Sequence, residues 1–148
     1  MALDFDLEMV TELKPQQALN ILATKLGLEW RQDNLKAPGI LINADVEDRW
    51  EQDVTEENFG FRPTLVVGFR INPNQDYEGG LRTLIRATIT LLQQTVGEAV
   101  LLFNYETVVL QRLGDKLILN EEMLEPSIIS EIDQFKLTYE LQVFPCSA

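Results

Sequence analysis

The chain has 148 residues, 45% of them hydrophobic, which is enough to bury one substantial core without disulfides or metal. It carries 24 acidic residues against 12 basic ones, a net charge of −12, with no histidine and one cysteine. These absences exclude histidine-dependent catalytic triads, ordinary zinc sites and an intramolecular disulfide. We therefore expect a single acidic domain over residues 1–148, with no cofactor.

The negative charge also limits the partners of the protein. Phosphate backbones and anionic membranes would repel it, so we expect no nucleic-acid partner and no membrane partner. No apolar run approaches the roughly 20 residues that span a bilayer. The first residues, Met1 to Asp6, are acidic and alternating, the reverse of a positively charged signal peptide. We expect a cytoplasmic protein, and nothing in the sequence indicates its oligomeric state.

The first third of the chain predicts a strand, a helix and two short strands. Leu3–Met9 alternates apolar and acidic residues, which is typical of a half-buried strand. Helical spacing of apolar residues follows over Pro15–Leu26, and Gly27 is a natural stop. Leu28–Arg31 and Ile40–Ala44 are expected to be strands, with a turn between them.

The segment from Asp45 to Asn58 holds seven carboxylates and one cation, Arg49. Val46, Trp50 and Val54 are four residues apart, a spacing that would align them on one side of a helix. Like charges at helical spacing weaken such a helix, so we expect it to be short or partly loop.

The rest of the chain predicts a strand, a long helix and further strands. Thr64–Ile71 alternates as a strand, and a helix capped near Asp76 is expected to reach about Thr95. Three antiparallel strands follow, then a short helical or irregular piece and a last strand: Ala99–Phe103, Thr107–Arg112, Lys116–Leu119, Pro126–Ile132 and Phe135–Phe144.

This order of elements predicts an α+β fold. Two helices packed on one face of a mostly antiparallel sheet is the economical arrangement. Without the final strands, the topology approximates a ferredoxin-like βαββαβ core with added C-terminal strands.

Catalytic and metal-binding motifs are missing from the chain. It has no phosphate-binding glycine loop and no dinucleotide-binding fingerprint. The nearest calcium-loop pattern begins at Asn72, but Tyr77 and Thr83 replace the turn glycine and the bidentate glutamate, so helix capping explains it better. We expect no catalytic, cofactor-binding or metal-binding residues. Cys146, near the C-terminus, carries no catalytic expectation.

Four passages resemble the immunity proteins of the myxobacterial swapping-mediated intoxicant (Sit) systems. They are the opening Met1–Leu7 with Thr11–Leu19, the Phe-Gly-Phe-Arg-Pro-Thr turn in Glu56–Thr64, the passage Gly97–Glu106 and the strand Leu117–Asn120. The resemblance covers about residues 1–120, and Tyr105 departs from the glycine expected at its position. It implies a non-enzymatic protein that binds and neutralises a cognate toxin. It carries over no contact residues.

The binding site must therefore be argued from charge. An acidic surface would steer a cationic toxin toward the protein, and an exposed aromatic residue would anchor it. We expect Trp50 to be the anchor, surrounded by the carboxylates Asp45, Glu47, Asp48, Glu51, Asp53, Glu56 and Glu57. Two alternatives remain open: a small-ligand or enzymatic domain with a carboxylate pocket between the sheet and the first helix, or an acidic subunit of a larger assembly.

Overall fold

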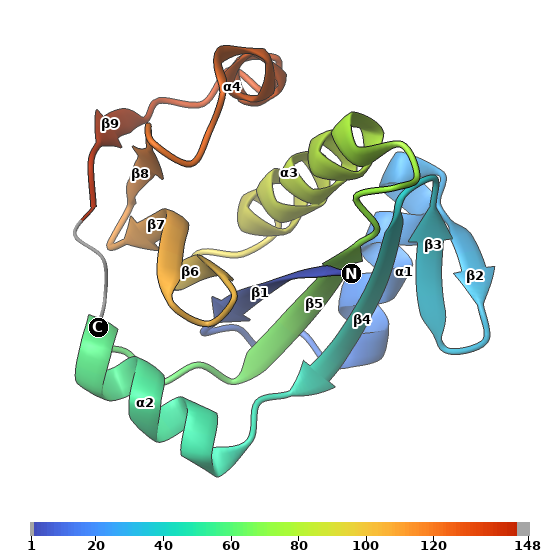
Figure 1. Cartoon of the computed structure of the whole chain (residues 1–148). Helices are drawn as coiled ribbons and strands as arrows, with labels where there is room; N and C mark the ends of the chain where they lie inside the picture. The colour runs from blue at the N-terminus through green and yellow to red at the C-terminus, as the bar shows by residue number, and fades with distance from the viewer. Residues whose placement is uncertain (1, 145–148) are drawn as a thin grey trace.

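The computed structural model describes residues 2–144 and shows four helices and nine strands in that range (Figure 1). Cys146 lies outside the described residues. The helices are α1 Pro15–Leu26, α2 Arg49–Phe59, α3 Tyr77–Gln93 and α4 Pro126–Asp133. The strands are β1 Leu3–Met9, β2 Glu29–Arg31, β3 Asn34–Ala37, β4 Ile40–Val46, β5 Leu65–Ile71, β6 Ala99–Phe103, β7 Thr107–Leu113, β8 Lys116–Asn120 and β9 Glu140–Gln142.

The strands form one sheet in the order β2-β3-β4-β5-β1-β6-β7-β8-β9. Neighbouring strands are antiparallel except for β8 and β9, which are parallel. The first strand of the chain lies in the middle, where Phe5 is paired with Phe69 of β5 and Phe103 of β6. The predicted α+β class with a mostly antiparallel sheet is confirmed.

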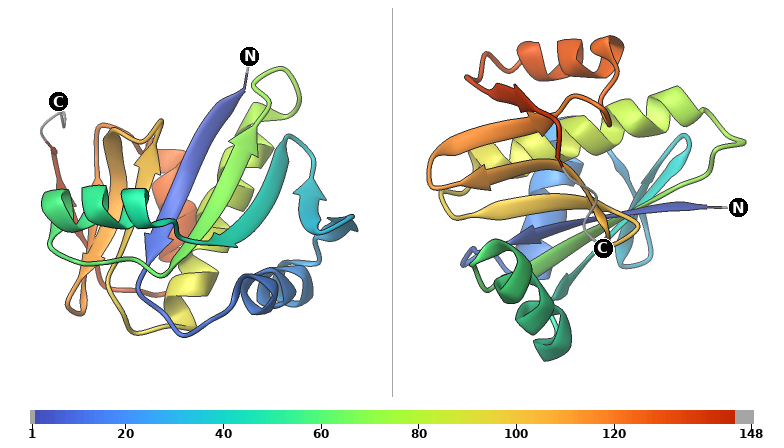
Figure 2. Two further views of the ribbon diagram at one scale, coloured as in Figure 1. Left: turned by 90° about the horizontal axis from the view of Figure 1, so that it is seen from below. Right: turned by 60° about the vertical axis from the view of Figure 1, so that its left-hand side comes forward.

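The main core lies between the sheet and helices α1 and α3. Leu7 and Met9 of β1 are fully buried, as are Leu22 of α1 and Ile85 of α3. Helices α1 and α3 contact each other and β4 and β5, and α4 packs on α3. Helix α2 lies on the other side of the sheet (Figure 2). We call the side that carries α2 the open face.

The structure corrects the prediction for the acidic segment. Helix α2 has 11 residues and regular ends, so it is neither short nor partly loop. Val46 belongs to β4 and lies outside the helix. The Asp48 side chain caps the first turn by accepting the Glu51 N–H at 2.8 Å. Gly60 ends the helix with φ of 80°, donating its N–H to the Glu56 carbonyl.

Two other strands differ from the predictions. β3 was missed, because it has only four residues with one fully buried side chain, Leu35, and two apolar residues are too short an alternation to indicate a strand. The last strand was predicted over Phe135–Phe144, but β9 covers only Glu140–Gln142. Phe135 and Leu137 pack against the core, and Lys136 between them has φ of 57°, which interrupts an extended chain.

Candidate functional site

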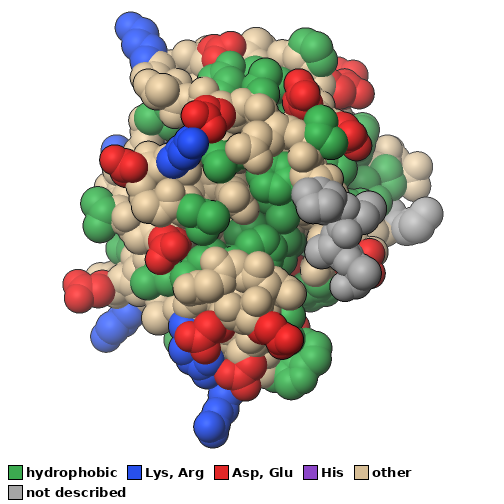
Figure 3. Space-filling model, turned by 90° about the vertical axis from the view of Figure 1, so that its left-hand side faces the viewer, with side chains coloured by type: hydrophobic (Ala, Val, Ile, Leu, Met, Phe, Trp, Pro, Cys, Tyr) green, Lys and Arg blue, Asp and Glu red, His purple; other side chains and the backbone are tan. Residues whose placement is uncertain are grey.

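Helix α2 carries most of the predicted site and is nearly all solvent-accessible. Thr55 is its one buried residue. Its hydroxyl donates to Oε1 of Glu8 on β1 at 3.3 Å, and Gln52 donates to the carbonyl of Pro63 at 2.8 Å. Seen from the side, Asp and Glu side chains are spread over the molecule, and over its lower part, where α2 lies, they stand beside Lys and Arg (Figure 3). Few side chains therefore attach α2 to the rest of the protein, and most of its other side chains are accessible to solvent.

The turn after α2 holds the helix against the sheet. Arg62 forms ion pairs with Asp53 at 2.7 Å and Glu56 at 3.1 Å, which offsets the repulsion between carboxylates of the helix. Phe59 and Phe61 lie with their ring centroids 6.3 Å apart. The Phe-Gly-Phe-Arg-Pro-Thr passage therefore has a structural role, because it fixes the position of α2.

The structure brings most of the predicted site residues to the surface. The exposed members are Asp45, Asp48, Trp50, Asp53, Glu56 and Glu57. Trp50 is 70% exposed and so is not a core residue. Glu47 departs from the expectation of a surface charge, because only 7% of it is exposed, and Glu51 is half-buried.

Glu47 and Glu51 lie close to carboxylates of β1 that sequence reasoning missed. Asp6 and Glu8 alternate with the core residues of β1, so they point to the open face. One oxygen of each of Asp6, Glu8 and Glu47 is buried without a hydrogen-bond partner among the described residues. The alternation of β1 was a usable signal, since it places acids on the face opposite the core.

Burial raises the pKa values of Asp6, Glu47 and Glu51. Desolvation, and then the charges of Asp4 and Glu51, raise the pKa of Asp6 from 3.8 to about 6, while the Tyr105 hydroxyl lowers it. Burial raises the pKa of Glu47 from 4.5 to about 7; the Asp48 N–H opposes this shift, and neighbouring carboxylates including Glu51 add to it. The pKa of Glu51 is also raised by burial. Burial thus favours the protonated form of each of these three acids over its charged form.

Tyr105, whose hydroxyl bonds Asp6, has an unusual backbone conformation. Asn104 and Tyr105 have φ of 54° and 62° in the turn between β6 and β7. Glycine adopts such angles without steric cost, which accounts for the glycine expected at this position. The charge of Asp6 is the main cause of a raised Tyr105 pKa, so the tyrosine responds to the acid that it bonds.

The described residues provide no arrangement for a metal centre. Within residues 2–144, no group of three or more His, Cys, Asp or Glu side chains could hold a metal ion. No helix in this range is long and apolar enough to cross a membrane. What the site offers is an exposed helix with an aromatic side chain, next to Asp6, Glu8 and Glu47, which form no ion pair within residues 2–144.

Comparison with known proteins identifies the family. No curated protein and no solved structure matches the chain. The family described as SitI3-like matches residues 3–126, which include α1, α2, α3 and all strands except β9. The resemblance noted from the sequence is confirmed. The family is one of non-enzymatic immunity proteins, which excludes the enzymatic alternative. The chain belongs to the SitI3-like family of Sit immunity proteins, and its expected partner is a Sit toxin.

Proposed function

We propose that the protein neutralises its cognate toxin by binding it through the outer surface of α2. The observation that carries this proposal is the 70% exposure of Trp50 on a helix with only one buried residue. Exposing an indole to water is unfavourable, and tryptophan is enriched among residues that dominate binding energy. Carboxylates around it would form the charged rim that typically surrounds the desolvated centre of an interface.

The toxin surface that binds here is cationic in this proposal. Asp6 and Glu47 have unpartnered oxygens and raised pKa values, so a lysine or arginine nearby would stabilise their charged forms. The exposed acids Asp45 and Glu57 would steer the encounter without being buried deeply. We also propose that the protein binds its toxin in the cytoplasm.

Charge reversal on the open face tests this proposal. Asp45→Lys with Glu57→Lys changes two exposed carboxylates, and association with the cognate toxin should slow by roughly tenfold at low salt. The matched control is Glu122→Lys with Glu125→Lys, two exposed acids next to α4 on the other side of the sheet. Equal association rates for the two variants, measured by stopped-flow or surface-based kinetics, would contradict the proposal.

We also propose that part of the sheet is a ferredoxin-like core. Support comes from the chain order β1, α1, β4, β5, α3, β6, and from the order β4-β5-β1-β6 within the sheet. In this proposal β2 and β3 are an inserted hairpin, and β7 to β9 extend the edge. An experimental structure with α1 and α3 on opposite faces of these four strands would contradict it.

A further inference from the structure

The open face has a second charged region, at the end of β4 and β5 away from α2. The strand register places Glu29, Lys36, Leu41, Arg70 and Asp4 side by side on β2, β3, β4, β5 and β1. Side chains opposite each other on neighbouring strands lie roughly 5 Å apart at Cβ, so this row is a continuous surface.

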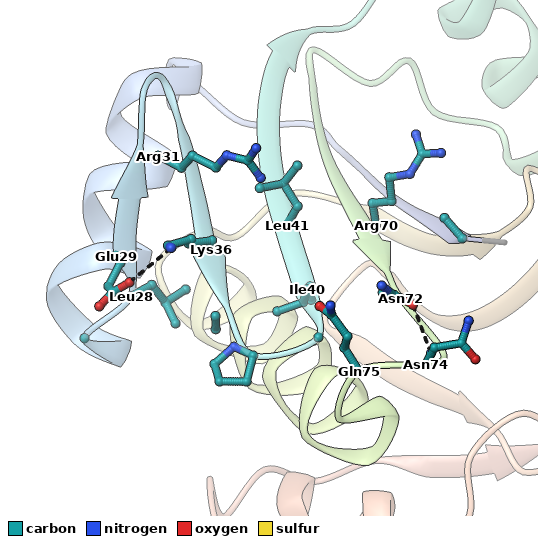
Figure 4. Close-up of a pocket in the computed structure, with 15 residues that line it drawn as sticks. Leu28, Glu29, Arg31, Lys36, Ile40, Leu41, Arg70, Asn72, Asn74 and Gln75 are labelled. Atoms are coloured by element: carbon teal, nitrogen blue, oxygen red, sulfur yellow. Dashed lines mark hydrogen bonds and ion pairs between the residues drawn. The ribbon is translucent and has the colours of Figure 1, made fainter.

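A cavity of about 980 Å³ opens at this row, and its charge is the reverse of that of the whole chain. Its lining contains three cations, Arg31, Lys36 and Arg70, and one carboxylate, Glu29. The chain as a whole has 24 acidic residues to 12 basic ones. Lys36 turns toward Glu29 at 3.7 Å, while Arg31 and Arg70 stand on either side of Leu41 (Figure 4). We call this cavity the basic pocket.

One wall of the basic pocket is fixed by backbone contacts. Gly39, between β3 and β4, has φ of 81°, and its carbonyl accepts the Asn72 N–H at 3.0 Å. A Cβ on Gly39 would collide with the Gln75 carbonyl oxygen. Only glycine allows this close approach, which holds the loop after β5 against the turn before β4. The pocket is therefore largely preformed.

The groups in the basic pocket suit a carboxylate carried on a partly apolar chain. Guanidinium groups donate in a planar fork that matches a carboxylate. Among the described residues, Arg31 and Arg70 have no ion pair that would compete for this role. Asn74 and Gln75 add neutral amide groups, and Leu41 contributes apolar surface.

The basic pocket continues into an acidic one. A neighbouring cavity of about 640 Å³ shares Leu41 and Arg70 with it; its lining joins open-face residues to Pro15, Gln16 and Leu19 of α1. The lining of this second cavity includes four carboxylates, Asp4, Asp6, Asp33 and Asp45. The open face is thus a trough that is positive at one end and negative toward α2.

We propose that the basic pocket receives an acidic segment of the toxin that binds α2, so that one partner lies along the whole trough. This inference rests on the proposed function, because it takes the toxin as the occupant. Complementary charges at both ends allow one orientation of the partner and oppose the reverse one, in which like charges would meet. A partner that is uniformly cationic would be repelled at the basic pocket.

The test uses two double variants with the same added negative charge. Arg31→Glu with Arg70→Glu reverses the basic pocket. Arg86→Glu with Lys136→Glu changes two exposed cations on α3 and after α4. For a toxin attracted only by overall charge, both variants would bind as well as the parent or more tightly. The proposal expects the pocket variant alone to lose affinity, by roughly tenfold or more, with faster dissociation.

The outcomes separate this inference from the proposed function. If the pocket variant binds the toxin as tightly as the control variant, the inference is overturned while binding through α2 stands. If the toxin does not bind the parent protein, the proposed function falls, and an independent probe decides on the pocket. Capped tetraglutamate should then shift the NMR amide signals of Arg31, Lys36 and Gln75, and capped tetralysine should not. No shift with tetraglutamate would overturn the pocket as a carboxylate site.

Discussion

The basic pocket and the α2 surface lie at opposite ends of one sheet face but are built differently. The pocket depends on a backbone contact at Gly39, where even a methyl group would collide with a carbonyl. The α2 surface depends on side chains, with Thr55 as the one buried residue of the helix. Sheet strands fix both positions, because alternation sends every second residue to the open face. Rigid backbone therefore shapes one end of the face, and an exposed helix forms the other.

The largest expected effect comes from the backbone contact. Gly39→Ala should lower the free energy of unfolding by about 2–4 kcal/mol, because its Cβ would collide with the Gln75 carbonyl oxygen and lie 2.6 Å from that of Asp76. The control is Gly60→Ala, which has a similar φ of 80° and no atom within 4 Å of the added Cβ. Its cost should be only the conformational strain, about 1 kcal/mol. If chemical denaturation gives the same loss of unfolding free energy for Gly39→Ala and Gly60→Ala, the backbone contact at Gly39 does not set the two ends of the face apart.

The next largest effect concerns binding through α2. Trp50→Ala should speed dissociation of the toxin by roughly 30-fold, equivalent to about 2 kcal/mol, without lowering the melting temperature. The reason is that Trp50 is 70% exposed and so contributes little to folding. Trp30→Ala, which removes an indole 42% exposed on β2, is the control and should leave dissociation unchanged. A lower melting temperature with unchanged dissociation would show that Trp50 supports the fold instead.

A pH effect on stability should originate near α2. The unfolded chain releases the Glu47 proton near pH 4.5, whereas the folded protein keeps it to about pH 7. Between these values the folded state binds more protons, so stability is full below the lower pKa and falls as pH rises through the upper one. Asp6, with a pKa of about 6 against 3.8, acts in the same direction. The other titratable groups that act on this pair are Asp4 on β1, Asp48 just before α2, Glu51 on α2 and Tyr105 on the facing turn.

Glu47→Gln should reduce this dependence. We expect the melting temperature of the parent protein to be a few degrees, about 4 °C, lower at pH 8 than at pH 5, and the difference to shrink in the variant. Glu57→Gln replaces an exposed carboxylate of α2 and should keep the full difference. If calorimetry shows the parent protein becoming more stable between pH 5 and pH 8, the assigned direction is wrong.

The smallest expected effect is at Tyr105. Tyr105→Phe removes the hydroxyl that lowers the Asp6 pKa, so this pKa should rise above about 6 in NMR titrations of the carboxyl carbon. Tyr105→Gly should give the same rise and also relieve backbone strain of about 1 kcal/mol, since φ is 62°. An Asp6 pKa that stays the same in both variants would show that the hydroxyl does not act on it.

Periodicity predicted most of the fold. β1 and α1 have the predicted bounds, because Leu3–Met9 and Pro15–Leu26 each repeat their apolar residues regularly. β9 is shorter than predicted, because alternation does not reveal that Phe135 and Leu137 turn into the core on either side of a left-handed residue. Alternation in the sequence therefore predicts too long a strand where the apolar residues are buried by a turn of the chain and not by strand pairing.

The candidate site was only partly visible in the sequence. The density of carboxylates from Asp45 to Glu57 indicated the acidic surface around α2, but the burial of Glu47, whose charge is close enough to interact with that of Asp6 on β1, left no local signal. The basic pocket was missed because Arg31, Lys36 and Arg70 lie on three different strands, and only the register brings them together. Charge counted along the chain finds clusters on one element, whereas clusters formed across a sheet require the pairing to be known.

The light attachment of α2 has an evolutionary consequence. Surface substitutions away from buried contacts usually change stability by less than about 0.5 kcal/mol. Outside Thr55 and the residues that bond the following turn, α2 can therefore vary in sequence while the sheet and the main core stay the same. Under the proposed function, a lineage that meets a new toxin could change its specificity by substitutions along this one helix, without having to find a new way to fold.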